Sequence, residues 1–322
     1  MTTIVCIIPT TATDAIYPSL HRCVTSVLES CIPDISVIII LTTTNKKPQL
    51  KQLLKHVDHI IHVDNNPGFS DLNNEALKFS LKNIPSAYHL FLNDDAKVDK
   101  KFFSIFNAIS IRVKSSIIVP IIYNYDNVID SFGIEYFTSG FPKNADKISI
   151  ITSLASASCL LVKTSLLNRI NKKYGFIFNQ LLYYYIEDVE FSIRAIAIGG
   201  KIHKTNELIA YHVGSLTSIK ESYFTYYYSF RNILWVIIMT WPTKIIITHL
   251  MKIVIVYSWL LFTTHFKGKK GVPGKIAIDT INHLKQLLCM RKKILCTYQK
   301  NFNFNSLFSP YMFRTRRRRI PI

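Results

Sequence analysis

The segment Tyr88-His89-Leu90-Phe91-Leu92-Asn93-Asp94-Asp95 passes from a mostly apolar run directly into three polar residues. A run of this length predicts a buried β-strand. Aspartates that follow such a strand emerge at the carboxyl edge of the sheet, where α/β proteins place their ligands. Because carboxylate oxygens suit Mg²⁺ or Mn²⁺, the segment predicts a sheet with a metal site at one edge.

Other apolar runs of strand length alternate with stretches of helical spacing. The predicted strands are Ile4–Ile8, Ser36–Leu41, His59–Val63, His89–Leu92 and Ile117–Ile121. The helical repeats between them are Leu20-Val24-Val27-Leu28, Leu50-Leu53-Leu54 and Leu72-Ala76-Leu77-Leu81. This order favours an α/β fold with a mostly parallel sheet and helices on both faces.

The middle of the chain has a weaker pattern. Tyr123–Ser149 is rich in Asn, Asp, Gly and aromatic residues, and we expect a loop that shapes the specificity side of a site. Order returns at Ala157–Val162, a strand-like run. Glu187–Ile198 then predicts a helix with an acidic first turn that ends at Gly199-Gly200. Asp188 is therefore expected at a helix start.

The net charge of +19 is concentrated near the carboxyl terminus. Residues 265–322 hold fourteen Lys or Arg against the single acid Asp279. This asymmetry is typical of a catalytic domain with a tail for an anionic surface. The six cysteines show no C-x-x-C spacing, which argues against a disulfide or zinc framework and for reduced thiols. The chain enters its first predicted strand with no signal-peptide pattern.

Two strongly apolar runs, Ile233–Trp241 and Ile245–Thr263, follow the predicted catalytic part and are separated by Pro242. The second is about long enough to span a bilayer but contains His249 and Lys252. These polar residues favour membrane-surface or re-entrant helices over a true span. We therefore expect a catalytic domain over residues 1–232 and a membrane-associating helical region with a basic tail over 233–322. The predicted location is the cytoplasmic face of the cell membrane, peripheral or monotopic.

Four motifs occur in order along roughly residues 3–235. They are Asn66-Pro67-Gly68-Phe69-Ser70-Asp71-Leu72-Asn73-Asn74; Phe91-Leu92-Asn93-Asp94-Asp95-Ala96; Gly175-Phe176 with Tyr183-Tyr184-Tyr185, Glu187-Asp188-Val189-Glu190 and Arg194; and Tyr211-His212-Val213-Gly214-Ser215. In this series the chain resembles the inverting glycosyltransferases of family 2 with the GT-A fold, especially the rhamnosyltransferase-like and galactofuranosyltransferase-like branch.

The resemblance implies a set of roles. Asp95 and His212 would hold a divalent metal, Mg²⁺ or Mn²⁺, against the diphosphate of a UDP- or dTDP-sugar. Asp188 would be the base that takes the proton of the acceptor hydroxyl, and Glu187 would orient a hydroxyl. The residues expected on the donor are Pro9, Thr10, Asn66, Gly68, Phe69, Asn74, Asn93 and Asp94. The donor sugar would be of the rhamnose or galactofuranose type, and the acceptor a polysaccharide or a lipid-linked oligosaccharide.

Departures from the family pattern leave some features open. Leu41-Thr42-Thr43-Thr44-Asn45 replaces a motif that contacts the base or ribose, and Phe176-Ile177-Phe178 replaces an acidic segment near the acceptor. Asn93 stands where some relatives carry Asp, which implies weak metal affinity. The sequence does not indicate the oligomeric state.

Structural roles compete with functional ones for single residues. Asn and Asp favour turns, Gly68 and Asn74 suit turns and caps, and Glu190 with Arg194 can be a purely structural i,i+4 pair. A nucleotidyltransferase is an alternative, but Pro9–Ala15 has no Gly or Lys for a phosphate loop. A basic nucleic-acid-binding protein is another, although no nucleic-acid motif accompanies the charge, and we expect no nucleic-acid partner.

Overall fold

The computed structural model describes residues 2–44, 54–64, 67–148, 154–212 and 222–311. Its main sheet is built from strands β1 (Thr2–Thr10), β2 (Ile35–Thr43), β3 (His59–His62), β4 (Tyr88–Leu92), β5 (Ala96–Val98), β6 (Ile117–Tyr123), β7 (Ile129–Ser131), β10 (Cys159–Lys163) and β11 (Ile202–His212). The order across the sheet is β3-β2-β1-β4-β10-β6-β11-β5, and β7 pairs with β6.

Most strands of this sheet run in one direction, and β10, β5 and β7 run in the opposite direction. β3, β2, β1 and β4 run parallel, as do β6 and β11, whereas β10 lies antiparallel between β4 and β6. The predicted mostly parallel sheet is confirmed, and each predicted strand overlaps an observed one. The reversed direction of β10 was not predicted, because an apolar run carries no sign of the direction in which it pairs.

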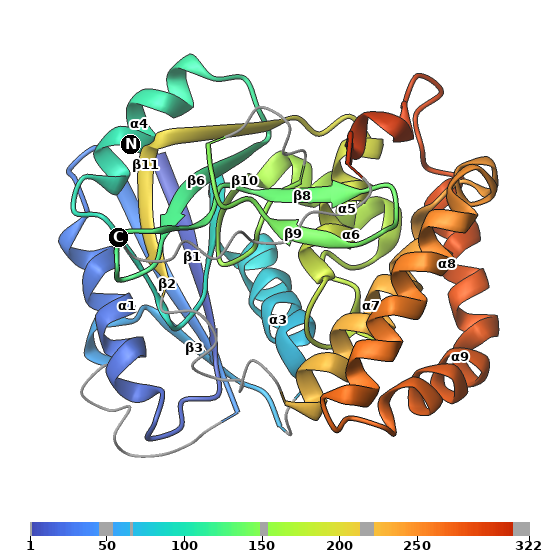
Figure 1. Cartoon of the computed structure of the whole chain (residues 1–322). Coiled ribbons are helices and arrows are strands. Elements are labelled where there is room, and N and C mark those ends of the chain that lie inside the picture. The colour runs from blue at the N-terminus through green and yellow to red at the C-terminus, as the bar shows by residue number, and fades with distance from the viewer. Residues whose placement is uncertain (1, 45–53, 65–66, 149–153, 213–221, 312–322) are drawn as a thin grey trace.

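Helices cover both faces of the sheet (Figure 1). The helices of one face are α1 (Tyr17–Glu29) and α4 (Phe102–Arg112), and those of the other are α3 (Gly68–Asn83), α5 (Thr164–Tyr174) and α6 (Glu187–Ala197). β1 shows why. Ile4, Cys6 and Ile8 join the core with α1 and α4, whereas Val5 and Ile7 join the opposite core, and all five are fully buried. A strand buried on both faces needs a continuous apolar run, which made it recognisable.

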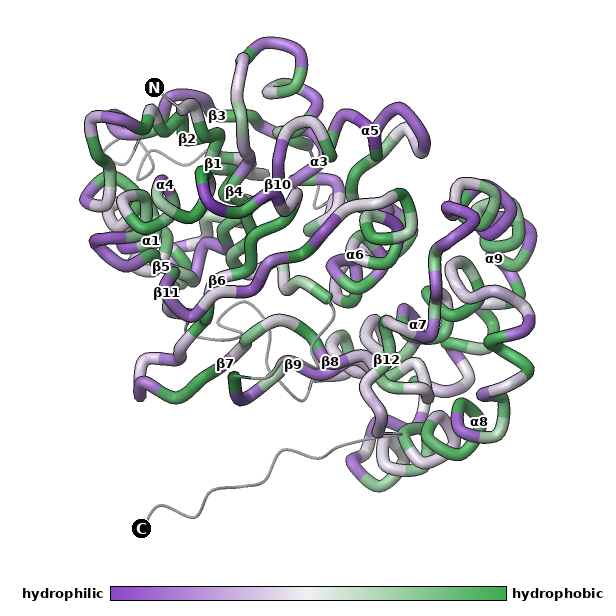
Figure 2. The backbone as a smooth tube through the Cα atoms, turned by 90° about the horizontal axis from the view of Figure 1, so that it is seen from above, coloured by the Kyte–Doolittle hydropathy of each residue, from purple (hydrophilic) through white to green (hydrophobic). Residues whose placement is uncertain are grey.

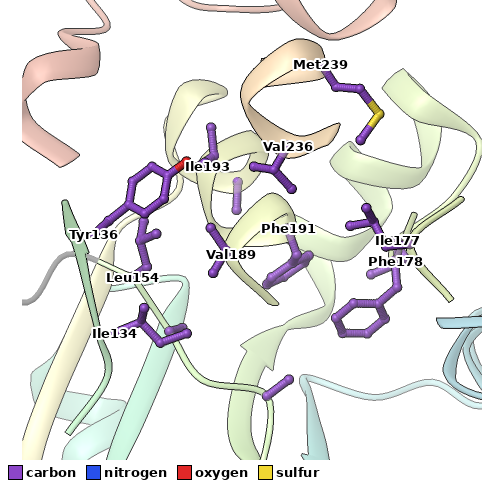
Figure 3. Close-up of a cluster of buried hydrophobic side chains, with 14 of the residues drawn as sticks. Ile134, Tyr136, Leu154, Ile177, Phe178, Val189, Phe191, Ile193, Val236 and Met239 are labelled. Atoms are coloured by element: carbon purple, nitrogen blue, oxygen red, sulfur yellow. The ribbon is translucent and has the colours of Figure 1, made fainter. Parts of the chain in front are cut away.

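A second, small sheet corrects the prediction of a loop over Tyr123–Ser149. It consists of β8 (Ile134–Phe137), β9 (Pro142–Asn144) and β12 (Phe308–Ser309), with β12 parallel to β8. Strands this short leave no readable alternation. Figure 3 shows the underlying cluster, in which Ile134 and Tyr136 lie opposite Val189 and Phe191 of α6. This core fixes the start of α6 relative to the sheet.

Three long helices, α7 (Tyr223–Thr240), α8 (Thr243–Phe266) and α9 (Val272–Leu295), form a group beside the sheet (Figures 1 and 2). Pro242 separates α7 from α8, as predicted. The Trp235 indole N–H donates to Thr280 Oγ1 at 2.9 Å and joins α7 to α9. By length and composition alone, Thr243–Thr264 could cross a membrane, and 17% of its most apolar window is buried. Single turns of 3₁₀ helix complete the description at η1 (Leu54–His56), η2 (Gln180–Leu182) and η3 (Phe304–Leu307).

Candidate active site

One cavity of about 860 Å³ gathers most of the predicted site residues at the carboxyl ends of β1 and β4. The predicted residues that line it are Pro9, Thr10, Phe69, Asn93, Asp94, Asp95, Glu187, Asp188 and His212. Its size is that of a pocket for a small-molecule substrate. Gly68 and Asn74 are not among the described lining residues, and Asn66 lies outside the described part of the chain.

The pairing of strands brings the predicted metal ligands together. β11 runs antiparallel to β5 with His212 opposite Ala96, so the imidazole reaches Asp95 in the preceding turn. His212 Nε2 lies 3.0 Å from Asp95 Oδ1. Adjacent ligands of an octahedral cation with bonds of about 2.1 Å lie about 3 Å apart. The contact is a hydrogen-bonded ion pair in this structure, and its two atoms would lie within reach of one cation once the Nε2 proton leaves.

Asp130, in β7, is a site residue that the sequence did not reveal. Its Oδ2 lies 3.1 Å from His212 Nδ1, so the ring bridges two carboxylates. Burial lowers the pKa of His212, but the hydrogen bonds to Asp130 and Asp95 outweigh it and raise the pKa to about 9. A carboxylate on the second ring nitrogen of a metal-binding histidine fixes its tautomer and orientation. Asp130 would have that role if His212 holds a metal.

Asp94 faces a different partner from Asp95. Its carboxyl is buried and hydrogen-bonded to the side chain of Thr10 at the end of β1. Burial raises the pKa of Asp94 to about 7, and repulsion by Asp95 contributes, although the bond to Thr10 opposes the rise. A cation or a substrate hydroxyl would favour its charged form.

Glu187 and Asp188 form the first turn of α6, as predicted. Asp188 Oδ2 accepts the Ala157 N–H at 3.2 Å, and Oδ1 accepts the Val189 N–H at 2.8 Å. Burial raises the pKa of Asp188 to about 6 in spite of these bonds. A carboxylate with this pKa is ionised at neutral pH and basic enough to take a proton.

Glu187 is more deeply buried than Asp188. Burial, and then repulsion by Asp188, raise its pKa well above the usual range. Among the described residues, its Oε2 atom has no hydrogen-bond partner. A buried polar atom without a partner is costly, so this oxygen suits a contact with a ligand hydroxyl.

Comparisons with known proteins agree with this architecture. The chain is 25% identical over 207 residues to the low-salt glycan biosynthesis hexosyltransferase Agl10 of Haloferax volcanii, which covers 60% of this chain and 64% of Agl10. GalNAc-T7, solved with UDP, GalNAc and Mn²⁺, matches with a TM-score of 0.57 at 14% identity, over 76% of this chain and 49% of that one. TarS 1-349 of S. aureus, solved with UDP, matches with a TM-score of 0.52 at 17% identity, over 90% and 80%. The chain has the GT-A glycosyltransferase fold.

No protein-family model matches this GT-A chain. It spans just under two thirds of the length of the curated hexosyltransferase that it resembles. The predicted fold is thus confirmed by the structural neighbours, whereas the roles of the individual site residues stay predictions.

The loop that leads into α6 of the GT-A domain is strained. Tyr183 has φ 65° and ψ −69°, and the Tyr184 N–H donates to the Leu182 carbonyl at 2.8 Å, which closes a γ-turn. Tyr185 and Ile186 also have positive φ values of 68°. A β-branched residue there is a true outlier, and such residues cost about 1–3 kcal/mol each. Strain of this kind persists only where the surroundings hold the loop in place.

Gly68 and Asn74 both contact the segment of chain that leads into α6. Gly68 has φ +79°, and a Cβ atom there would lie 2.6 Å from the Tyr183 carbonyl oxygen. Asn74 Oδ1 accepts the Phe178 N–H at 2.9 Å, and Asn74 Nδ2 donates to the Phe178 carbonyl at 2.7 Å. Both residues therefore have packing or bonding roles in the described structure, and their contact with a donor stays a prediction.

Glu190 and Arg194 form the i,i+4 pair that the sequence indicated. Both side chains are fully buried, and Arg194 Nη2 lies 2.6 Å from Glu190 Oε2. The guanidinium also stacks over Tyr174 and Phe176. A pair enclosed in this way is part of the core beneath α6.

Proposed function

We propose that this protein is a metal-dependent inverting glycosyltransferase that moves a hexose from a nucleoside diphosphate to a hydroxyl acceptor. One observation carries the proposal: a single cavity holds the Asp95–His212 pair at the separation of adjacent metal ligands together with Asp188, whose pKa is about 6. The GT-A fold and the likeness to a hexosyltransferase support the same class of reaction.

The proposed transfer is a single displacement. Asp188 takes the proton of the acceptor hydroxyl while its oxygen attacks the anomeric carbon of the donor. The bond between that carbon and the diphosphate oxygen breaks, and the nucleoside diphosphate leaves with the bonding electrons. The attack comes from the face opposite the leaving group, so the anomeric configuration inverts. Glu187 would bind a hydroxyl of the acceptor or donor through Oε2.

The proposed metal site would bind Mg²⁺ or Mn²⁺ only together with ligands from the substrate. No group of three His, Cys, Asp or Glu in the described ranges forms a metal cluster. Asp95 and His212 would therefore share the cation with the two phosphates and water, as Mg²⁺ sites on nucleotides commonly do. A bound cation would neutralise the charge that grows on the leaving diphosphate. Its binding requires His212 to release the proton on Nε2, and Asp130 would keep the remaining proton on Nδ1 by accepting its hydrogen bond.

We assign the donor to the UDP- or dTDP-hexoses. Two structural neighbours were solved with UDP, which makes UDP the first choice. The rhamnose and galactofuranose types follow from the motif resemblance. A panel of UDP- and dTDP-hexoses, with Mn²⁺ and a saccharide acceptor, tests this assignment. Nuclear magnetic resonance of the product should show the anomeric configuration inverted. Retention would exclude the single displacement, and no turnover with any donor or acceptor would count against the enzyme class.

We further propose that α8 and α9 rest on an anionic membrane surface and bring the enzyme to a lipid-linked saccharide. The exposed apolar residues form helical stripes: Ile247, Leu250, Met251, Val254, Ile255, Trp259, Phe262 and Phe266 on α8, and Ile278, Ile281, Leu284 and Leu288 on α9. The exposed cations Lys267, Lys270, Lys275 and Lys285 lie on or next to the same helices. Apolar stripes beside cations are typical of interfacial helices.

The opposite side of α8 packs on the protein, which favours lying on the surface over spanning. Ile253, Val256 and Leu260 are buried, and Tyr257 donates to the Phe230 carbonyl of α7 at 2.6 Å. A spanning helix would lose these contacts. Flotation with anionic vesicles tests the proposal: Ile247→Asp/Met251→Asp should reduce vesicle binding, and Ile111→Asp, at an exposed position on α4, should not.

A further inference from the structure

We infer that Arg231 and Asn232 of α7 are positioning residues that hold the strained Tyr183–Ile186 loop, and through it Glu187 and Asp188, in reactive geometry. This inference rests on the proposed function. No motif of the sequence pointed to these two residues as part of the site, and neither lines the catalytic cavity. They act from about fifty residues further along the chain, as the hydrogen bonds to the loop show.

Asn232 is fully buried and directs its amide at the loop. Nδ2 donates to the carbonyls of Leu182 and Tyr184, both at 2.7 Å, and of Tyr185 at 2.8 Å. Two amide hydrogens thus serve three carbonyls of a loop whose γ-turn and positive φ angles depart from regular structure. Removing the amide would remove all three of these hydrogen bonds at once and weaken the hold on the loop.

Arg231 extends the contact between α7 and this loop to the carbonyl of Leu181. Its Nη2 donates to the carbonyls of Leu181 at 3.0 Å and Leu182 at 3.1 Å, and its Nε donates to Asn232 Oδ1 at 2.9 Å. The last bond fixes the orientation of the Asn232 amide, so that Nδ2 faces the loop. The guanidinium itself is held over the Trp235 ring at 4.1 Å. Arg231 and Asn232 are therefore a connected clamp rather than two separate contacts.

The clamp affects Asp188 because the Tyr183–Ile186 loop leads directly into the first turn of α6. Ile186, with φ 68° and ψ 0°, is the residue before the first turn of α6, and Glu187 and Asp188 follow it directly. Relaxation of the loop to ordinary backbone angles would rotate that turn and move both carboxylates. Thr10, Asp94 and Asp95, on the donor side, belong to β1 and the β4–β5 turn rather than to the loop. The clamp should therefore affect transfer more than nucleotide binding.

The experiment compares Asn232→Ala with Tyr257→Phe, which loses a 2.6 Å bond to the α7 carbonyl of Phe230 and does not touch the loop. In full-length protein, we expect Asn232→Ala to lower kcat about 100-fold, the effect of a misplacement near 1 Å, with donor KM changed less than about twofold. Hydrogen exchange of residues 181–188 should accelerate without substrate. Tyr257→Phe should keep wild-type kcat and exchange in that segment. Arg231→Lys should show a smaller loss with the same pattern.

Two results would overturn the clamp. The first is unchanged hydrogen exchange of residues 181–188 in Asn232→Ala. The second is a loss of kcat in Asn232→Ala that is not specific to transfer, either because Tyr257→Phe shows the same loss or because UDP binding falls by the same factor. Failure of the proposed enzyme function is distinguishable, because wild-type protein would then turn over no donor while the exchange comparison would still report the loop.

Discussion

Two acidic pairs lie in the same cavity and are held in opposite ways. Asp94–Asp95 follows a buried strand, and Asp95 contacts the cationic ring of His212. Glu187–Asp188 begins a helix, and Asp188 accepts only backbone N–H groups in the contacts described above. Burial raises the pKa of Asp94 to about 7 and that of Asp188 to about 6, so a raised pKa alone does not separate the two pairs. What separates them is the contact between Asp95 and His212, two side chains that would hold a metal once the ring is neutral, and Glu187–Asp188 has no such contact with a histidine among those described above.

The substitution with the largest expected effect is Asp188→Asn. An amide keeps the shape of the side chain but cannot take a proton, so kcat for transfer should fall by about 10²–10⁴-fold. The dissociation constant for UDP with Mn²⁺, measured by calorimetry, should stay within about twofold of wild type. If turnover survives in Asp188→Asn, the two acidic pairs do not divide the chemistry as described.

Asp95→Ala should produce the converse pattern. Loss of one of two protein ligands should weaken Mn²⁺-dependent UDP binding by about 100-fold or more, since even second-shell changes cost 10–100-fold. Calorimetric titration of UDP with and without Mn²⁺ measures the effect. Undiminished metal-dependent affinity would place the metal elsewhere in the protein.

Asp130→Asn sharpens the comparison at the residue that orients His212. The amide would no longer hold the Nδ1 proton through a charge, and Mn²⁺ affinity in the presence of UDP should fall by about 10–100-fold. Asp126→Asn, an exposed acid in the β6–β7 connection, is the matched control and should leave affinity unchanged. Equal behaviour of the two variants would remove Asp130 from the site.

The pH dependence gives the smallest effect. Burial raises the pKa of Asp188 to about 6, and only the carboxylate can accept a proton. With Mn²⁺ and donor at saturation, where the protonation of free Asp94 and His212 does not limit binding, kcat should therefore fall as the pH drops below about 6, by about tenfold at pH 5. The residual rate of Asp188→Asn should lack this decline. A flat profile in wild type down to pH 5 would contradict Asp188 as the titrating base.

The sequence predicted those parts of the fold in which burial forces a local pattern. Ile4–Ile8 was readable as a strand because both its faces are buried, and α6 was readable from its acidic first turn. Asp95 and His212 were predicted by motif resemblance, and strand pairing places them in contact.

The rest depended on contacts between distant segments. Asp130 is one of several acids in the stretch after β6, and only the pairing of β7 with β6 brings it to His212. Asn232 lies directly before the apolar run Ile233–Trp241, and nothing in the sequence around it indicated the loop that it holds. The division of the chain at residue 232 stays a prediction, and α7 runs through that position.

The most direct test is the melting temperature of wild type, Asp95→Ala and Asp188→Asn with UDP, each with and without Mn²⁺. A nucleotide at 100 times its Kd should stabilise the fold by about 2.7 kcal/mol. We predict Mn²⁺-dependent stabilisation of wild type and Asp188→Asn, and its loss in Asp95→Ala. Loss in both variants, or in neither, would contradict the assignment of the two acidic pairs to separate tasks.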